Sequence, residues 1–320
     1  MNEIQFQHKP VMVGGVLEYL RPKAGGIYVD GTLGGGGHTK AILKTANCRI
    51  IGIDRDLEAI FAAKKNLADY KDQVTFVHDN FSNLPAILRS LDIPKVDGIL
   101  LDLGVSSHQL ESPSRGFSFQ KDAPLDMRMD QRDDLTAGKI INFYDEKKLA
   151  DLFYKYGEER YSRQIAKKII ERRGQSPRRG LSPIRPIRTT DELVEIIKSA
   201  TPPEYRFNLP ASRQGSKIHF ATRVFQALRI EVNDELKILE DFIPKAAQLL
   251  AKDGRLLIIS FHSLEDRIVK HTFRDLAQNN PKKYKILTKK PITPSVEEIT
   301  RNPRSRSAKM RVLEKTIEDR

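Results

Sequence analysis

The sequence predicts an α/β fold in which a Rossmann-like parallel sheet is interrupted by an inserted all-helical segment. In the first hundred residues, short apolar runs alternate with amphipathic runs of helix length, a pattern typical of βαβ units. After residue 138 the apolar spacing is helical and contains no strands, and a buried strand returns only after residue 250. The first four predicted strands are Ile27–Asp30, Arg49–Asp54, Val74–His78 and Val96–Asp102.

Amphipathic helices are predicted between these strands, and a mainly helical stretch follows them. Residues 103–138 are rich in Gly and Pro and are expected to form loops, whereas residues 145–173 keep a helical spacing of apolar side chains. A Pro/Arg/Gly stretch at 174–188 ends that pattern, and Thr190 is expected to cap the next helix. The predicted helices are Thr39–Thr45, Leu57–Tyr70, Leu84–Leu91, 145–173 and Thr190–Ala200, with a polar loop at 201–215.

The C-terminal part is expected to complete the sheet. Long helical patterns from Lys217 to Leu250 lead to a turn at 252–254 and a buried strand, Arg255–Phe261. A helix at 264–277 and two final strands, Tyr284–Thr288 and Met310–Leu313, are expected after it. We therefore predict a discontinuous sheet domain (1–105 and 213–320), connecting and active-site loops (106–138) and an inserted helical substrate-recognition domain (139–212).

The composition indicates a globular protein with an unevenly distributed positive charge. With 30% charged and 39% hydrophobic residues the chain is not disordered. No apolar run reaches the roughly 20 residues that span a bilayer, and the N-terminus does not resemble a signal peptide. The single cysteine, Cys48, excludes intrachain disulfides, so we expect a cytoplasmic protein.

The net charge of +13 is concentrated in two segments. Residues 160–190 contain ten basic residues and one acidic residue, and residues 282–320 contain twelve and five. Two basic segments on an otherwise slightly acidic chain favour a polyanionic partner such as a nucleic acid. Solvated, flexible basic stretches without a partner are the alternative.

A glycine-rich turn follows the first strand and predicts a cofactor site. The run from Asp30 to His38 contains five glycines and opens a helix, an arrangement in which backbone can approach a ligand. Asp30 would repel a pyrophosphate but suits the sulfonium and ammonium groups of S-adenosylmethionine, and Thr39 stands where the dinucleotide fingerprint needs a third glycine. Asp54 is expected to accept hydrogen bonds from ribose hydroxyls. Phe81 is expected to contact adenine or to pack in the core.

Several further motifs stand in order along nearly the whole chain: His8–Val11, Leu100–Leu110, Arg115–Phe119, Pro124–Asp130, Tyr156–Arg160, Phe225–Ile230, Ser260–Arg267 and Asn302–Ser307. Together they resemble the ribosomal RNA small subunit methyltransferase H family, also called MraW. The resemblance implies a class I S-adenosylmethionine methyltransferase that methylates N4 of cytidine 1402 in 16S rRNA, at the P site of the 30S subunit. His108 and Phe220 replace prolines that the family usually has. The cofactor contacts that the resemblance implies are Gly36, Gly37, His38, Asp54, Phe81, Asp102 and Gln109.

Two side chains are candidate catalytic residues. Asp102 ends the fourth strand and could accept hydrogens of the cytosine amine, or it could mainly bind the cofactor. His262 follows the fifth strand and could orient the base, or it could cap the next helix. Cys48 precedes the second strand, at the edge opposite the expected ligands, which argues against the cysteine attack used in C5 methylation. Tyr154, Tyr156 and Tyr161 could stack on bases, but their helical spacing is more typical of core residues.

Three rival functions follow from the same residues. An RNA-binding ribosome-assembly factor could keep the fold without catalysis, a methyltransferase could act on another RNA amino or ribose group, and a nicotinamide-dependent oxidoreductase could use a similar sheet. The histidines are scattered, so we expect no metal site. The sequence leaves the oligomeric state open, a homodimer included.

Overall fold

A computed structural model describes residues 10–174, 184–207 and 219–317. The chain divides into two compact units. The first, here called the sheet unit, comprises residues 1–106 and 236–320, and the second, the helical unit, comprises residues 107–235. Within the described residues no helix is both long and apolar enough to cross a membrane.

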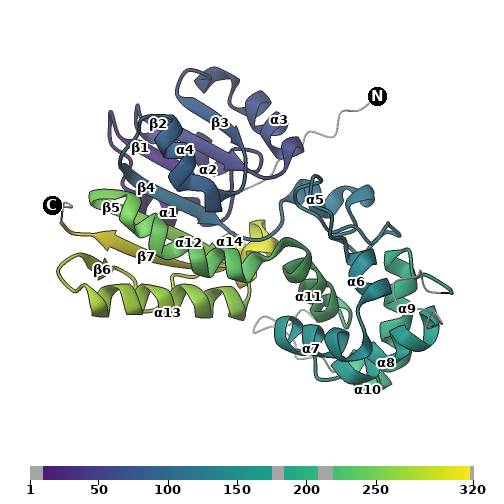
Figure 1. Cartoon of the computed structure of the whole chain (residues 1–320). Helices are drawn as coiled ribbons and strands as arrows, with labels where there is room; N and C mark the ends of the chain where they lie inside the picture. Colours follow the sequence, from purple (N-terminus) through teal and green to yellow (C-terminus); the bar gives the residue numbers. More distant parts are fainter. Residues whose placement is uncertain (1–9, 175–183, 208–218, 318–320) are drawn as a thin grey trace. The chain divides into compact units, whose positions relative to one another are not determined.

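The sheet unit contains a seven-stranded sheet with the order β3-β2-β1-β4-β5-β7-β6 (Figure 1). Strands β1 to β5 pair in parallel, and β7 is antiparallel to both β5 and β6. This mixed sheet, together with the helical unit, confirms the predicted fold class. The strands are β1 (Ile27–Asp30), β2 (Arg49–Asp54), β3 (Val74–His78), β4 (Val96–Asp102), β5 (Leu250–Ser260), β6 (Tyr284–Ile286) and β7 (Lys309–Lys315).

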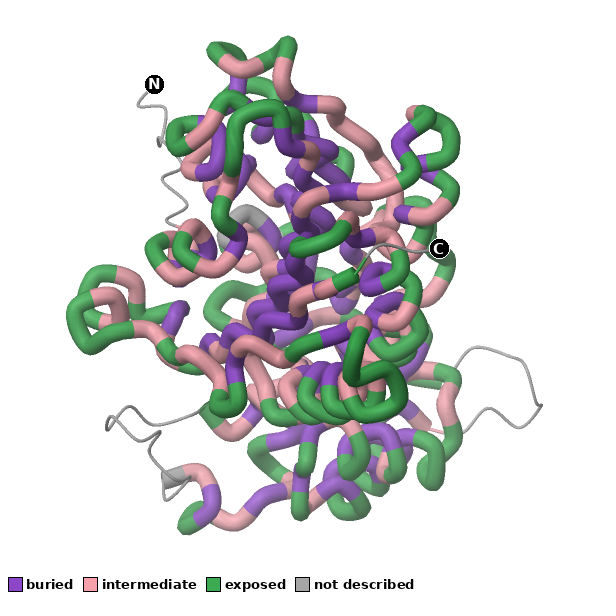
Figure 2. The backbone as a smooth tube through the Cα atoms, turned by 90° about the vertical axis from the view of Figure 1, so that its left-hand side faces the viewer, coloured by how far each residue is buried: buried purple, intermediate pink, exposed green. Residues whose placement is uncertain are grey.

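Helices cover both faces of the sheet, because each central strand is apolar on both sides. Adjacent residues of β2 show this clearly: Ile50 faces one core and Ile51 the other, and both are fully buried. Figure 2 shows buried residues following the strands and exposed residues on the outer turns. One face carries α1 (Val13–Leu20), α2 (Gly37–Thr45) and α3 (Leu57–Asn66), and the other carries α4 (Leu84–Ser90), α12 (Glu235–Leu249) and α13 (Ser263–Asn279).

Short elements complete the sheet unit, and several boundaries differ from expectation, two of them by more than two residues. The helix predicted as Leu57–Tyr70 ends at Asn66 and is followed by the 3-10 turn η1 (Ala68–Tyr70). The turn predicted at 252–254 lies inside β5, which begins at Leu250: Val96 pairs with Leu250 and Gly98 with Arg255, so the extra residues of this register shift lie in β5. The other short elements are η2 (Phe81–Asn83), α14 (Val296–Arg301) and η4 (Pro303–Ser307).

The helical unit is built around α7, which packs against both α8 and α11. Helix α11 belongs to this unit, whereas the sequence placed its residues with the sheet from residue 213 onward. Gly157 explains the close approach, since a Cβ at this position would lie 2.6 Å from the Arg223 carbonyl oxygen. The helices are α5 (Ser107–Glu111), α6 (Ala137–Phe143), α7 (Glu146–Gly157), α8 (Ser162–Arg173), α9 (Thr190–Ala200), α10 (Pro203–Phe207) and α11 (Thr222–Asn233), with the 3-10 turn η3 at Pro113–Arg115.

The N-terminus of α9 differs by one residue from the prediction. Thr189, not Thr190, is the cap, because its hydroxyl accepts the Glu192 N–H and the Glu192 carboxylate accepts the Thr189 N–H in return. Thr190 is fully buried, and its hydroxyl accepts the Ala123 N–H from another part of the unit. Helix α10 lies inside the stretch that was expected to be a loop.

The stretch 103–138, expected to form loops, has a buried centre. Arg115 is 1% exposed and donates to the carbonyls of Arg128 and Met129. Gly116 has φ +67°, and a Cβ there would lie 2.1 Å from the Pro124 carbonyl oxygen. Two of the family-like motifs therefore stabilise each other in this segment.

Candidate functional site

The glycine turn between β1 and α2 is held by strict backbone requirements. Gly34 donates its N–H to Asp54 Oδ2 at 2.7 Å, which ties the turn to the end of β2. Gly36 has φ +78°, and a Cβ there would lie 2.7 Å from Leu67 Cδ1. A side chain at Gly36 is therefore opposed by both its conformation and its neighbour.

Asp30 stabilises the turn from inside. Its carboxylate is 1% exposed, accepts the Thr39 hydroxyl at 2.8 Å and accepts the Thr32 N–H at 3.3 Å. Burial raises the pKa of Asp30 above its usual value. The sequence argument assigned this carboxylate a charge effect on the ligand, whereas the structure shows it bonded to the turn and to α2.

Asp54 lies at the end of β2 and holds two backbone groups. Oδ2 accepts the Gly34 N–H, and Oδ1 accepts the Asp56 N–H at 2.9 Å. Burial raises the pKa of Asp54 to about 6, against the lowering effect of these two hydrogen bonds. Each oxygen keeps a second lone pair, so the carboxylate can still accept hydroxyl hydrogens.

Asp102 carries a buried acceptor atom. Its N–H donates to the Thr32 hydroxyl at 2.6 Å, which joins the end of β4 to the glycine turn. Within the described part of the chain, its Oδ1 atom is buried and has no hydrogen-bond partner. Such an atom costs about 1–3 kcal/mol unless a ligand or water pairs with it, so this carboxylate indicates a ligand site.

Burial raises the pKa of Asp102 to about 6, and three neighbours modify this effect. His38 lowers the pKa, whereas the carboxylates of Asp30 and Glu265 raise it. Asp102 therefore changes its charge close to neutral pH, as a proton acceptor in a reaction requires.

His38 and Gly37, at the start of α2, contact Pro10 and Val11, here called the N-terminal segment. His38 Nε2 lies 2.8 Å from the Val11 carbonyl oxygen, and a Cβ on Gly37 would lie 3.1 Å from the Pro10 ring. Sequence reasoning missed these partners, because a backbone carbonyl carries no residue-type signal and the spacing of the two segments does not predict their contact. The His8 of the motif lies outside the described residues.

Phe81 and His262 both have structural roles. The Phe81 ring packs edge-to-face on Phe242 in the core, with centroids 4.9 Å apart, so the core-packing alternative is realised. His262 caps α13: its Nδ1 accepts the Glu265 N–H, and the Glu265 carboxylate accepts the His262 N–H. Contact with adenine for Phe81 and with a base for His262 stay predictions.

Gln109 and Cys48 are two further residues that the sequence analysis singled out, and both are buried. Gln109 is buried on α5 in the helical unit, so its implied cofactor contact stays a prediction. The His108 side chain beside it is outside those that the structure describes. Cys48 is buried directly before β2, and burial raises its pKa to about 11, so it is a neutral thiol at physiological pH.

The basic segments contain both structural and solvent-facing cations. In the helical unit Arg173 is buried and donates to the Ile141 and Tyr144 carbonyls. In the sheet unit Lys315 is buried and donates to the Leu250 carbonyl at 2.8 Å. Exposed cations in these segments, which can meet a polyanion, include Arg163, Lys167, Lys168 and Arg172 on α8 and Lys282, Lys289, Lys290, Arg301 and Arg304 near the C-terminus.

The tyrosines that could stack on bases differ in exposure. Tyr154 is 69% exposed on α7, whereas Tyr161 packs against the Tyr205 ring with centroids 4.7 Å apart. Arg160 lies over both of these rings, 4.6 Å from the Tyr205 centroid. Tyr161 is thus engaged within the unit, and Tyr154 presents its ring to solvent.

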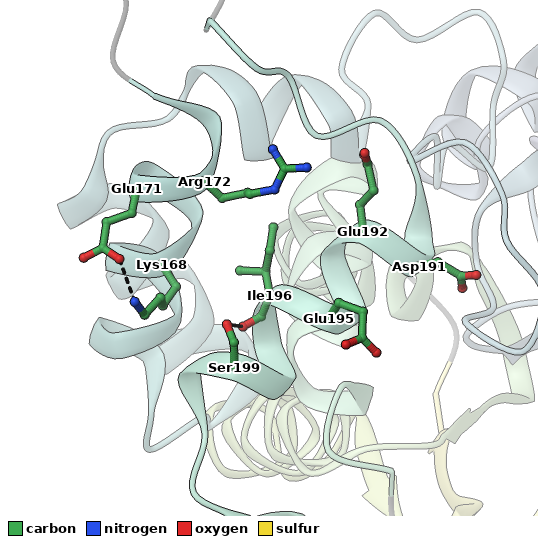
Figure 3. A pocket seen from close by; sticks show the side chains of 8 residues that line it. All are labelled: Lys168, Glu171, Arg172, Asp191, Glu192, Glu195, Ile196 and Ser199. Atoms are coloured by element: carbon green, nitrogen blue, oxygen red, sulfur yellow. Dashed lines mark hydrogen bonds and ion pairs between the residues drawn. The ribbon is translucent and has the colours of Figure 1, made fainter.

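A pocket of about 630 Å³ lies between α8 and α9 in the helical unit (Figure 3). Lys168 and Glu171 form an ion pair at its edge, with N and O atoms 2.8 Å apart. Because four acidic residues and only two basic ones line it, its charge does not suit a polyanion. The lining residues are Lys168, Glu171, Arg172, Asp191, Glu192, Glu195, Ile196 and Ser199.

Comparisons with known proteins agree on one family. A family model described as the MraW methylase family matches residues 5–316. The ribosomal RNA small subunit methyltransferase H of Kosmotoga olearia is 49% identical over 311 residues, covering 96% of this chain and 97% of that protein. The proteins of the same name from Trichormus variabilis (50% over 319 residues, 99% and 95%) and Clostridium botulinum strain Loch Maree (49% over 327 residues, 98% and 100%) are similarly close.

Proposed function

The chain belongs to the MraW methylase family, and from this premise we propose that it methylates N4 of cytidine 1402 in the 16S rRNA of the 30S subunit. As a member of this family, the protein is an S-adenosylmethionine-dependent rRNA methyltransferase with a class I fold. Our proposal adds two points: the methylated cytidine lies at the ribosomal P site, and the methyl group is transferred to its amino nitrogen. An enzyme acting on this substrate would work in the cytoplasm.

The residues of the sheet unit fit S-adenosylmethionine. The glycine turn is tied to the end of β2 by Asp54, and this carboxylate offers lone pairs to ribose hydroxyls. Asp102 ends β4, the strand beside β1, and its Oδ1 has no hydrogen-bond partner among the described residues. When bound, S-adenosylmethionine supplies an electrophilic methyl group on a sulfonium. We propose that Gly36, Gly37 and His38 of the turn, with Asp54, Phe81, Asp102 and Gln109, form the cofactor site.

The buried Oδ1 atom of Asp102 is the observation that supports the cytosine amine as the methylated group. The lone pair of a cytosine amine is delocalised into the ring, so the nitrogen attacks well only when it becomes pyramidal. A carboxylate that accepts an amine hydrogen favours this geometry and then takes the proton released by transfer. Asp102 Oδ1 is buried, lacks a partner and belongs to a group with a pKa of about 6, which suits both tasks.

Cofactor binding tests the role of Asp54. We expect Asp54→Ala to weaken binding of S-adenosylhomocysteine by about 1–3 kcal/mol, the contribution of a hydrogen bond to a charged group. Because the Asp54 pKa is about 6, this contribution should be present above that pH and should be lost as the pH falls through it. Calorimetric titrations between pH 5 and 8 measure both effects. Asp69→Ala, an exposed charge change in η1, is the control, and equal affinities for Asp54→Ala and wild type would contradict the assignment.

Salt dependence tests the C-terminal basic segment. We expect Arg304→Ala/Arg306→Ala to reduce the slope of log binding constant for rRNA against log salt by about 1.4–1.8, because two phosphate contacts are lost. The matched control is Lys270→Ala/Arg274→Ala, which removes the same charge from the exposed face of α13. An unaltered slope in the first variant would show that η4 does not contact phosphate.

Methyl transfer in vitro tests the proposed function against its rivals. The protein is incubated with methyl-labelled S-adenosylmethionine and 30S subunits, and the RNA is digested to nucleosides. We expect label in N4-methylcytidine. Binding to 30S without transfer would favour the assembly-factor alternative, and label on a ribose or on another amino group would favour a methyltransferase of different specificity.

A further inference from the structure

The imidazole of His38 is held in one orientation. Its ring is 6% exposed, and Nε2 lies 2.8 Å from the Val11 carbonyl oxygen. Because a carbonyl only accepts hydrogen bonds, Nε2 donates its hydrogen to Val11, and in the imidazolium form Nδ1 carries the second hydrogen. Nδ1 lies 3.8 Å from Asp102 Oδ2. The N-terminal segment therefore determines which ring nitrogen faces the carboxylate.

His38 and two carboxylates affect the pKa of Asp102 in opposite directions. Two carboxylates act on Asp102, Asp30 from β1 and Glu265 from α13, and both disfavour a second negative charge. His38, from α2, is the group with the opposite effect among those acting on Asp102 in the described residues. The two oxygens of Asp102 thus differ: Oδ2 faces His38, and Oδ1 is buried without a partner.

We propose that His38 is a positioning residue for methyl transfer: held by the Val11 carbonyl, its imidazolium form presents Nδ1–H to Asp102 Oδ2 and favours ionised Asp102, so that Oδ1 can receive a hydrogen of the substrate amine. The inference rests on the proposed function, in which Asp102 accepts that hydrogen. It assigns to the N-terminal segment and to His38 a part in proton transfer, in addition to the implied cofactor contact.

The proton balance of the reaction shows where His38 acts. The amine lone pair forms the bond to the methyl carbon while the carbon–sulfur bond breaks, and its electrons stay on sulfur. The amine nitrogen then has one proton too many, and this proton passes to Asp102 Oδ1. A carboxyl group that is already protonated cannot accept it, so the reaction needs the ionised form, which the imidazolium form of His38 stabilises from 3.8 Å.

The test replaces His38 with Gln, which keeps an N–H for the Val11 carbonyl and removes the group that acts on Asp102. The Asp102 titration is followed in the cofactor-free protein by NMR of ¹³C-labelled aspartate, with Asp102→Asn to assign the signal. We expect the midpoint to rise by about one pH unit in His38→Gln. Single-turnover rates with 30S subunits, measured at saturating cofactor, should show their acidic limb displaced by the same amount.

His78→Gln is the matched control. His78 ends β3 and also has Nε2 bonded to a backbone carbonyl, that of Arg55 at 3.1 Å, but it does not act on Asp102. This variant should leave the Asp102 midpoint and the rate profile unchanged. His38→Asn serves as a second variant should the first fail to fold, and the same upward shift is expected. Ring ¹⁵N signals of the wild-type protein should show His38 with its hydrogen on Nε2 when neutral.

The outcomes separate this inference from the proposed function. An Asp102 midpoint that does not move in the His38 variants, or a neutral His38 with its hydrogen on Nδ1, would overturn the role of His38 even if N4-methylcytidine is formed. If the midpoint moves as expected but the product is another nucleoside, the proposed function fails, while the coupling of His38 to Asp102 stands.

Discussion

Asp102→Asn is expected to lower the single-turnover rate of methyl transfer about 10²–10⁴-fold, the usual contribution of a general acid or base. The substitution keeps the shape of the side chain and an oxygen acceptor but removes the negative charge. Asp97→Asn is the matched control, because Asp97 lies in the same strand near its opposite end, where it pairs with Lys23. A rate for Asp102→Asn within threefold of wild type would exclude Asp102 as the acceptor.

The same substitution should change the pH dependence of stability. The Asp102 pKa is raised from 3.8 to about 6, so its stabilising contribution is fully present below pH 3.8 and is lost as the pH rises through 6. The free energy of unfolding of wild type should therefore fall relative to that of Asp102→Asn, by about 2 kcal/mol between pH 4 and pH 7. Urea unfolding of both proteins across this range measures the difference, and parallel curves would contradict the raised pKa.

Gly36→Ala is expected to destabilise the sheet unit by about 2–4 kcal/mol. A non-glycine residue at φ +78° is strained, and the added Cβ would lie 2.7 Å from Leu67 Cδ1, so either the turn or Leu67 must move. The turn is bonded to Asp54 through Gly34, and its movement should also weaken cofactor binding more than tenfold. Hydrogen exchange of β1 and β2 amides in the cofactor-free protein reports the loss of stability.

Gly35→Ala is the matched control in the same turn. Gly35 does not have the positive φ of Gly36, and a Cβ there would meet only the Asn66 side chain, at an ordinary 3.6 Å. Its effect on stability should stay within about 1 kcal/mol. Equal destabilisation by the two substitutions would show that the conformation of Gly36 is not what the turn requires.

The parallel part of the fold was predictable because its signals are local. Strands β1 to β4 begin and end at the expected residues, since each is an apolar run with a carboxylate at or next to its end. The start of β5 was not predictable: residues 252–254 look like a turn, and only pairing with Val96 across a register shift extends the strand to Leu250. The cap at Thr189 was predictable but was missed: Glu192 three residues later gives Thr189, and not Thr190, the capping-box spacing.

The site was predictable where a residue type carries the chemistry, and not where a backbone group does. Asp54 and Asp102 follow from their places at strand ends, which the register of the parallel strands brings to one edge. The Val11 carbonyl on His38 has no sequence signal, although it determines which nitrogen faces Asp102. Asp30 was correctly singled out, but its buried bonds to Thr39 and Thr32 give it a structural role that charge alone did not suggest.

The central claim is tested most directly by mapping the modified nucleotide in rRNA. 16S rRNA from cells with and without the gene is cut into fragments, and the mass and fragmentation of the segment around cytidine 1402 are measured. We expect one methyl group on N4 of this cytidine in cells with the gene and its loss in cells without it, with restoration by wild type but not by Asp102→Asn. An unchanged methylation pattern in cells without the gene would contradict the proposed function.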